Sequence, residues 1–327
     1  MNQQDALKVF SADGLNNIKQ RVSYPSDNPT IWKFVDLSTF LTILTDSCLF
    51  FSSINNLCTD DPFECALWPC QKYNGWTKDI FIDRALSLSS VLPRPDLFEE
   101  QIMQLERFGT YLAKADENKL IETVSWLELE FYRRRIICSC WHENMHESDA
   151  MWKIYSARTG VAIKSTAELL AQSIEGYMTE THSIQEIHYV MERVHYCEEP
   201  QLASVPELYV SCPWMLKRSG FEHEKEIRIF NQAPDKTPAG SGIRIKVNLL
   251  RLAEQIVLSP FNPKYVNDGI QRAVKKIVLE LDGKVRPSDH MRKPIITNPF
   301  LCDKENRKSV ESSCHNMDFL IKNKLLF

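Results

Sequence analysis

Glycine is scarce in this chain, which has 10 glycines among 327 residues. Phosphate-binding loops need glycines at fixed spacing, and the sequence contains neither the dinucleotide-binding fingerprint nor a P-loop. Long apolar runs are also lacking, because no stretch approaches the roughly 20 apolar residues of a membrane span. These absences argue against a glycine-loop nucleotide site and predict a protein with no membrane partner.

Neither sign of charge dominates. The 39 basic and 43 acidic residues leave a net charge of −4, so no basic excess draws the whole chain to nucleic acid, and a nucleic-acid partner stays open. The first ten residues have no apolar segment of the kind found in secretory signals, and the ten cysteines follow no regular spacing. We therefore expect reduced thiols and a soluble, cytoplasmic protein.

The pattern of apolar residues predicts an α+β fold. Residues 1–24 read as an N-terminal helix, residues 25–300 as the main domain and residues 301–327 as a C-terminal tail. Short alternating segments predict a mixed or largely antiparallel sheet with flanking helices on one side. A mostly helical insertion is expected at about 75–135.

Three local patterns give further expectations. Ser38 is placed to cap a helix that follows the first strand, and residues 206–217 look helical. The segment Asp60-Asp61-Pro62-Phe63-Glu64 has the form of a helix start in which Asp61 and Glu64 make a capping box. A carboxylate cluster after a strand and a loop is also a common place for a functional site.

The segment FEHEKEIRIF, at 221–230, carries the strongest functional signal. On an alternating strand Glu224, Glu226 and Arg228 share one face, while Ile227 and Ile229 point into the core. Such a row of charges is costly to bury unless the charges are paired. One interpretation is a solvated edge in which Arg228 pairs with Glu226 or Asp61; the other is a catalytic carboxylate.

Five segments in this order resemble the bacterial family catalogued as domain of unknown function 2971. The segments span about residues 30 to 290 and are Trp32-Lys33-Phe34, Phe50 to Glu64, Cys138 to Trp141, Met151 to Ile163, and Phe221 to Arg228. The chain departs from the family at Asp60, where Asn is usual, and at Phe221 and Ile227, where Trp is frequent. The resemblance implies a bacterial or phage-related protein, in a toxin or phage-defence setting, without an established reaction.

A more distant resemblance, in the order of motifs, is to the ADP-ribosyltransferases. That family has a basic or polar residue on a first strand, a Ser or Tyr on a later strand and a Glu on a last strand. Lys33, then Ser52 or Ser53, then Glu226 match this order, although that family has Arg or His where this chain has Lys33. The resemblance implies NAD as cofactor and an oxocarbenium-like transition state that a carboxylate stabilises. The predicted catalytic residues are Glu226, Glu224 and Arg228.

Further residues are expected to bind the nucleotide. A cation such as Lys33 or Arg228 would hold the diphosphate, and Trp152 and Tyr155, one helical turn apart, would stack on an aromatic ring or else pack in the core. The predicted cofactor-binding residues are Lys33, Ser52, Asp61, Trp152, Tyr155 and Arg158. We expect Lys33, Asp61, Trp152, Arg158 and the three catalytic residues to converge on one cleft.

Several alternatives stay open. A non-catalytic binding or regulatory module would show Glu226 and Arg228 satisfied by each other on a closed surface. A metal-dependent nuclease would use Asp60, Asp61 and Glu64 as hard oxygen ligands. Cys138, Cys140 and His142 could bind zinc, or Cys140 could act as a nucleophile with His142. The predicted site itself contains no metal, and the partner is expected to be a nucleotide, another small molecule or a protein.

Overall fold

The computed structural model describes residues 22–59, 61, 63–65, 73–91, 107–156, 159–178, 184–185, 189–198, 205–206, 209, 212–233 and 241–291. The chain divides into two compact units, Met1–Pro287 and Ser288–Phe327. The second unit contributes the short 3₁₀ helix η7 (Asp289–Met291) to the described residues, and everything below concerns the first unit. The predicted tail at 301–327, and most of the predicted helix at 1–24, lie outside the described residues.

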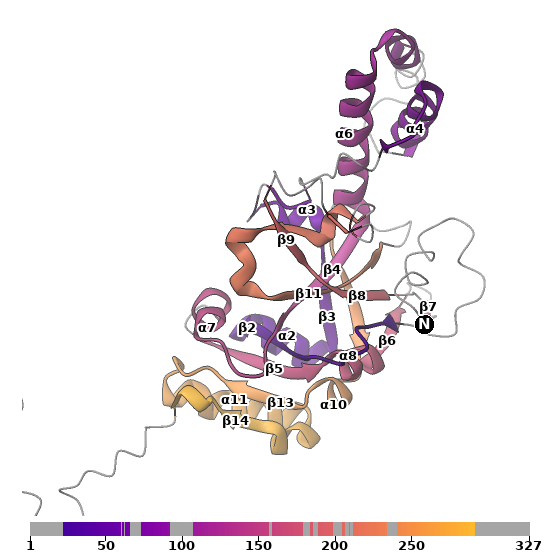
Figure 1. Ribbon diagram of the computed structural model, residues 1–327. Helices are drawn as coiled ribbons and strands as arrows, with labels where there is room; N and C mark the ends of the chain where they lie inside the picture. The colour runs from indigo at the N-terminus through magenta and orange to yellow at the C-terminus, as the bar shows by residue number, and fades with distance from the viewer. Residues whose placement is uncertain are drawn as a thin grey trace, which may run out of the picture. The chain divides into compact units, whose positions relative to one another are not determined.

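A branched, mostly antiparallel sheet of twelve described strands organises the first unit (Figure 1). Its strands are β1 (Val22–Ser23), β2 (Thr30–Asp36), β3 (Cys48–Ser53), β4 (Ile136–Glu143), β5 (Gly160–Thr166), β6 (Ile174–Met178), β7 (Ile184–Gln185), β8 (Tyr189–Arg193), β11 (Glu226–Gln232), β12 (Ile243–Val247), β13 (Gln255–Leu258) and β14 (Val285–Pro287). The pairs β1–β8 and β13–β14 are parallel. A second, parallel sheet joins β9 (His195–Cys197) to β10 (Leu216–Arg218). The predicted α+β class with a mixed sheet is confirmed.

Strand β4 is the branch point. One of its edges pairs with β11 from Ile136 to His142. The other edge is shared, because β2 pairs at His142 and Glu143 while β3 pairs at Ile137 and Cys138. The two strands diverge between these points, so residues 139–141 have no strand partner on that edge. The sheet is therefore forked beside the middle of β4.

Helices cover both faces of the sheet. They are α2 (Leu37–Asp46), α3 (Ile54–Leu57), α4 (Lys78–Val91), α6 (Glu117–Arg135), α7 (Asp149–Tyr155), α8 (Ala167–Ser173), α10 (Leu249–Leu252) and α11 (Lys264–Ile277), with 3₁₀ helices η4 (Pro213–Met215), η5 (Ser219–Glu224) and η6 (Leu279–Lys284). Helices α2, α8, α10 and α11 share the main core with Ile31 and Val35 of β2. Helix α7 packs on Trp32 and Phe34, which lie on the opposite face. The expectation of helices on one side is wrong, because β2 buries both of its faces.

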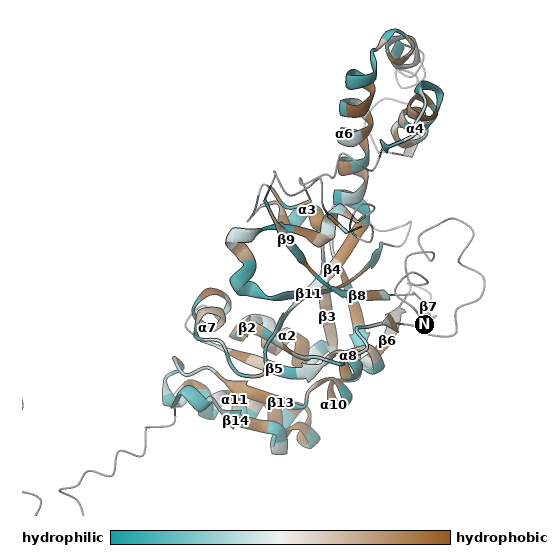
Figure 2. Ribbon diagram, viewed as in Figure 1, coloured by the Kyte–Doolittle hydropathy of each residue, from teal (hydrophilic) through white to brown (hydrophobic). Residues whose placement is uncertain are grey.

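The expected helical insertion is present. Helix α4, a helical segment at 107–114 and helix α6 pack around a separate small core that includes Phe81, Leu112 and Val124. Helix α6 runs directly into β4 and has α4 beside its far end (Figure 1). Hydrophilic and hydrophobic residues alternate along α6, as expected of a helix with one packed face (Figure 2).

Three local predictions need correction. Asp36, not Ser38, caps α2: its carboxylate accepts from the amide of Thr39 at 2.8 Å, because the helix begins directly after β2. The helical prediction for residues 206–217 holds at Tyr209 and in η4, but fails at Leu216 and Lys217, which begin β10 and pair with β9. Residues 22–23 form β1 rather than the end of a helix, since they pair with β8.

Gly160 stands where β5 meets β2 with no room for a side chain. A Cβ atom there would lie 2.2 Å from the carbonyl oxygen of Val35 and 3.0 Å from Cβ of Ser156. We expect Gly160→Ala to lower the free energy of unfolding by about 1–3 kcal/mol, as overpacked cores do. Gly269 in α11 is the matched control: no atom lies within 4 Å of its Cβ position. Ala there should stabilise by roughly 0.5–1 kcal/mol in urea unfolding. Equal midpoints for the two variants would contradict the close approach.

Candidate functional site

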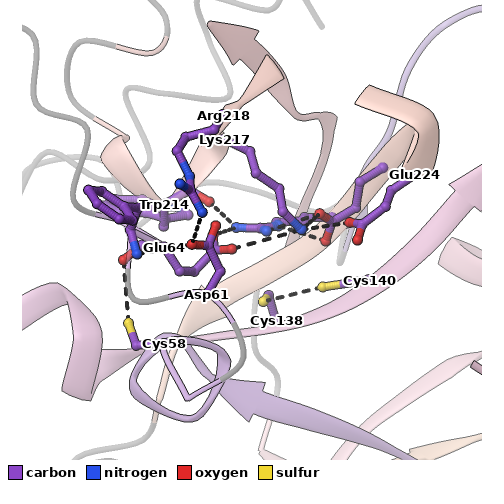
Figure 3. Close-up of polar contacts among 12 residues, drawn as sticks. Cys58, Asp61, Glu64, Cys138, Cys140, Trp214, Lys217, Arg218 and Glu224 are labelled. Carbon is purple, nitrogen blue, oxygen red and sulfur yellow. Dashed lines mark hydrogen bonds and ion pairs between the residues drawn. The ribbon is translucent and has the colours of Figure 1, made fainter. Parts of the chain in front are cut away.

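Five charged side chains from four segments meet on one face of the sheet, and Figure 3 labels Glu64, Lys217 and Glu224 among them. These are Glu64 in the turn at 63–65, Lys217 on β10, Glu224 at the end of η5, and Glu226 and Arg228 on β11. Each is at most 8% exposed, and Arg228 is 0% exposed. Burying charge is costly unless it is paired, so the geometry of the pairs decides what this cluster can do. We call these five residues the charge cluster.

Arg228 is the centre of the charge cluster. Its Nε and Nη2 donate to the two carboxylate oxygens of Glu226 at 2.8 and 3.0 Å, a bidentate pair. Its Nη1 donates to Glu64 Oε1 at 2.6 Å and also to the carbonyl oxygen of Trp214. The guanidinium thus donates four of its five N–H groups to the protein. It therefore has no free donor pair with which to hold a diphosphate.

Lys217 completes the charge cluster from the opposite side. Its ammonium group lies 2.6 Å from Glu224 Oε2, 3.3 Å from Glu226 Oε2 and 3.9 Å from Glu64 Oε2. The three carboxylates therefore share two cations, and the charge cluster carries one formal negative charge. This lysine was not among the predicted site residues. Its sequence signal is the basic pair Lys217-Arg218 just before the charged motif, but only the β9–β10 pairing shows that Lys217 points inward.

The pairing decides the protonation states. Burial disfavours the charged form of Glu226, but Arg228 and Lys217 outweigh it and lower the pKa of Glu226 to about 2. Burial likewise works against the charge of Lys217, but Glu226, Glu64 and Glu224 together outweigh it, so the pKa of Lys217 lies above its usual range. Both groups are therefore ionised at neutral pH. Glu226 therefore has the ionised carboxylate that the predicted reaction needs, but both of its oxygens already accept hydrogen bonds from Arg228.

The backbone explains why these side chains meet. In the register of β11 with β4, Glu226 faces His142 and Arg228 faces Cys140, so these four residues lie on one side of the sheet. Ile227 and Ile229 lie on the other side, in the main core. The predicted alternation of Glu226 and Arg228 with two isoleucines is confirmed.

Glu224 reaches the charge cluster by a different route from the predicted one. It is not on the strand, because β11 begins at Glu226 and Glu224 ends the 3₁₀ helix η5. The turn between them places Lys225 at φ 40°, a left-handed conformation that non-glycine residues rarely adopt. This turn, and not strand periodicity, brings the Glu224 carboxylate beside Glu226.

The side chains of Tyr155 and Trp152 lie in different surroundings. The hydroxyl of Tyr155 donates to Glu224 Oε1 at 2.8 Å, while the residue stays 42% exposed. Trp152 is 0% exposed and packs edge-on against Phe34, with ring centroids 4.9 Å apart. The predicted stacking pair is therefore wrong for Trp152, which is a core residue, while Tyr155 borders the charge cluster.

Asp61 lies at the border of the charge cluster, whereas Ser52 is not part of it. Asp61 accepts from Arg218 Nη2 at 2.8 Å and from the amide of Phe63 at 3.0 Å, and the 63–65 turn then carries Glu64 to Arg228. The predicted capping box is therefore wrong for Glu64, whose carboxylate is an ion-pair partner. The hydroxyl of Ser52 donates to the neighbouring carbonyl of Ser53. Arg158 lies outside the described residues.

Lys33 lies on the opposite face of the sheet from the charge cluster. Trp32 faces His142 in the pairing of β2 with β4, so Lys33 projects to the other side. Its ammonium group donates to the Cys140 carbonyl at 2.8 Å and to the Ser139 hydroxyl at 3.2 Å. The Lys33 side chain thus bonds to the part of β4 that has neither β2 nor β3 as a strand partner. Burial lowers the pKa of Lys33. The predicted convergence of Lys33 and Trp152 with the glutamates on one cleft is wrong.

The structure also bears on the two other hypotheses, a metal site and a nucleophilic Cys140. Among the residues that the structure describes, no group of three or more His, Cys, Asp or Glu side chains is placed to hold a metal ion. Contact with the Cys138 thiol, together with burial, raises the pKa of Cys140 well above its usual range, which leaves a poor nucleophile. The ring of His142 is bonded through Nδ1 to the carbonyl oxygen of Glu224.

Three aromatic side chains and one arginine border the charge cluster. The guanidinium of Arg218 lies 4.3 Å from the ring centre of Phe63 and 5.4 Å from that of Phe221. Phe63 is 52% exposed and Tyr155 is 42% exposed. Lys217 lies 4.8 Å from the centre of the Phe221 ring, so the rim and the charge cluster are in contact. We call Phe63, Arg218, Phe221 and Tyr155 the aromatic rim.

Comparison with known proteins adds no family assignment, since no protein-family model, no curated protein and no solved structure matches the chain. Among the described residues no helix is long and apolar enough to cross a membrane.

Proposed function

We propose that this chain is a ligand-binding module in which the buried charge cluster fixes the shape of the aromatic rim, and the rim holds the ligand. The observation that carries the proposal is the bidentate pair of Arg228 and Glu226, which are 0% and 5% exposed. Such mutual saturation favours a structural role for the pair. The exposed rings of Phe63 and Tyr155 are then the groups left to make contacts outside the chain.

The charge of the site favours a particular ligand chemistry. The charge cluster carries one net negative charge, and the Arg218–Asp61 pair adds none. Aromatic rings beside a negative charge favour a planar cation over a bare phosphate, because ring faces attract positive charge. The oxidised nicotinamide ring of NAD is such a cation, so NAD is the first ligand to test.

The experiment compares two dinucleotides that differ in ring charge. We expect NAD to raise the melting temperature of the wild-type chain, and NADH, whose ring is neutral, to raise it less. A ligand at 100 times its dissociation constant stabilises the native state by about 2.7 kcal/mol. Phe63→Ala should abolish the shift, whereas Phe50→Ala should retain it. These two residues are equally exposed, at 52% each, but only Phe63 contacts Arg218. Equal shifts in both variants, or none in the wild type, would rule out the rim as the NAD site.

A second candidate is ADP-ribosyl transfer, with Glu224 rather than Glu226 as the reacting carboxylate. It is favoured by the position of Glu224, whose side chain is 9% exposed and whose Oε1 is held by the half-exposed Tyr155. In this reaction the nicotinamide–ribose bond breaks, nicotinamide keeps the electron pair, and the carboxylate stabilises the ribosyl cation until a nucleophile captures it. Nicotinamide release by wild type, lost in Glu224→Gln while the NAD shift persists, would establish cleavage of the nicotinamide–ribose bond over binding alone.

A further inference from the structure

Two thiols on β4 form a pair beside the charge cluster, where the Cys140 side chain interacts with the Glu226 carboxylate. Cys138 and Cys140 are two residues apart on one strand, so both side chains project from the same face. Their sulfur atoms lie 4.0 Å apart, and both cysteines are free (Figure 3). A thiolate–metal bond is about 2.3 Å long in zinc sites, so one ion can lie within bonding distance of both sulfurs.

The donor set limits which ion can bind. No third His, Cys, Asp or Glu among the described residues completes a metal-binding group with this pair. The nearest carboxylate of the charge cluster, Glu226, is already bonded to Arg228 through both of its oxygens. Zinc in structural sites takes four ligands, which this pair cannot supply. Two thiolates alone suit a soft ion such as Cu(I).

The surroundings of the pair are buried and contain groups of both charges. Arg228 is the register partner of Cys140 on the adjacent strand, so its guanidinium lies on the same side of the sheet. Lys33 donates to the backbone carbonyl of Cys140 from the other face of the sheet. Apolar residues around Cys138, including Ile54, Val190 and Phe230, exclude water. In such a low-dielectric site, with the Glu226 carboxylate nearby, the two thiols lose their protons only in exchange for a metal ion that offsets the charge of the thiolates.

We propose that Cys138 and Cys140 form a two-coordinate binding site for a soft monovalent metal ion of the Cu(I) class. On binding, each thiol releases its proton to solvent and forms one sulfur–metal bond, and no electron is transferred. Cys138 is 1% exposed and Cys140 is half-buried, so the ion enters from the side of Cys140.

The test measures the copper stoichiometry of the full-length chain without oxygen. Cu(I) is supplied from a chromophoric competitor, and the metal content is read by native mass spectrometry. The chain has ten cysteines, so the informative quantity is the difference between variants. Wild type and Cys48→Ser should bind equal numbers of ions, because Cys48 is a half-buried thiol elsewhere, on β3. Cys138→Ser and Cys140→Ser should each bind one ion fewer.

The equal loss from either substitution is the distinctive result, since it means that both sulfurs hold the same ion. Circular dichroism melting would show whether each variant folds, and Cys138→Ala replaces Cys138→Ser if the buried hydroxyl prevents folding. Zn(II) supplied in place of Cu(I) should show no difference between wild type and the two variants. Wild-type copper stoichiometry in a folded Cys138 or Cys140 variant would overturn the proposal.

Discussion

Replacing Arg228 with methionine is expected to lower the free energy of unfolding by about 3–5 kcal/mol. Arg228 is fully buried and donates to both Glu226 and Glu64, so its loss leaves three carboxylates with one cation, Lys217. Methionine has a similar length and no charge, so lost packing contributes little. Urea unfolding followed by circular dichroism gives the midpoint and the slope from which this free energy is obtained.

Two further variants separate charge from packing. Arg244 also pairs with an aspartate, Asp46, but its side chain is 62% exposed, so Arg244→Met should cost less than about 1 kcal/mol. The double variant Glu226→Leu with Arg228→Met removes one charge of each sign and restores the original net charge of the cluster. We expect it to be more stable than the sum of the single effects predicts, by roughly 0.5–3 kcal/mol. A cost for Arg228→Met no larger than that for Arg244→Met would show that the cluster is not a buried ion network.

Lowering the pH should reduce the free energy of unfolding by an amount comparable to the effect of Arg228→Met. The pKa of Glu226 is lowered from 4.5 to about 2 in the folded chain, because Arg228 and Lys217 outweigh the effect of burial. A lowered folded-state pKa stabilises the protein above the unfolded pKa, and this contribution is lost as the pH falls through the folded value. We therefore expect about 3 kcal/mol from this one group to disappear between about pH 5 and pH 2.

The matched variant for the acid experiment is Glu226→Gln, which keeps the shape and cannot ionise. It should be less stable than wild type at pH 7, and its stability should fall less steeply below pH 5. The two unfolding free energies should therefore approach each other as the pH nears 2. Parallel curves for wild type and Glu226→Gln over this range would mean that Glu226 titrates normally and is not held by Arg228.

The candidate site was only partly predictable. The period of two in residues 226–229 correctly placed Glu226 and Arg228 on one face, because alternation is a property of the strand itself. The same rule failed for Glu224, since the left-handed turn at Lys225 ends the strand pattern. The rule also failed to place Lys33. Alternation shows which residues of β2 share a face, but it does not show which of the two faces is the one that carries Glu226 and Arg228.

By itself the sequence determined the α+β class, the helical insertion and the core-facing side of β11, because these follow from the local spacing of apolar residues. Only the tertiary structure decided which partners the charged residues find. Glu64 meets Arg228 across 164 residues of chain, and this contact depends on how β4 is shared by β2, β3 and β11. The strand register and the fork fix such pairs, and both are set by contacts between distant segments.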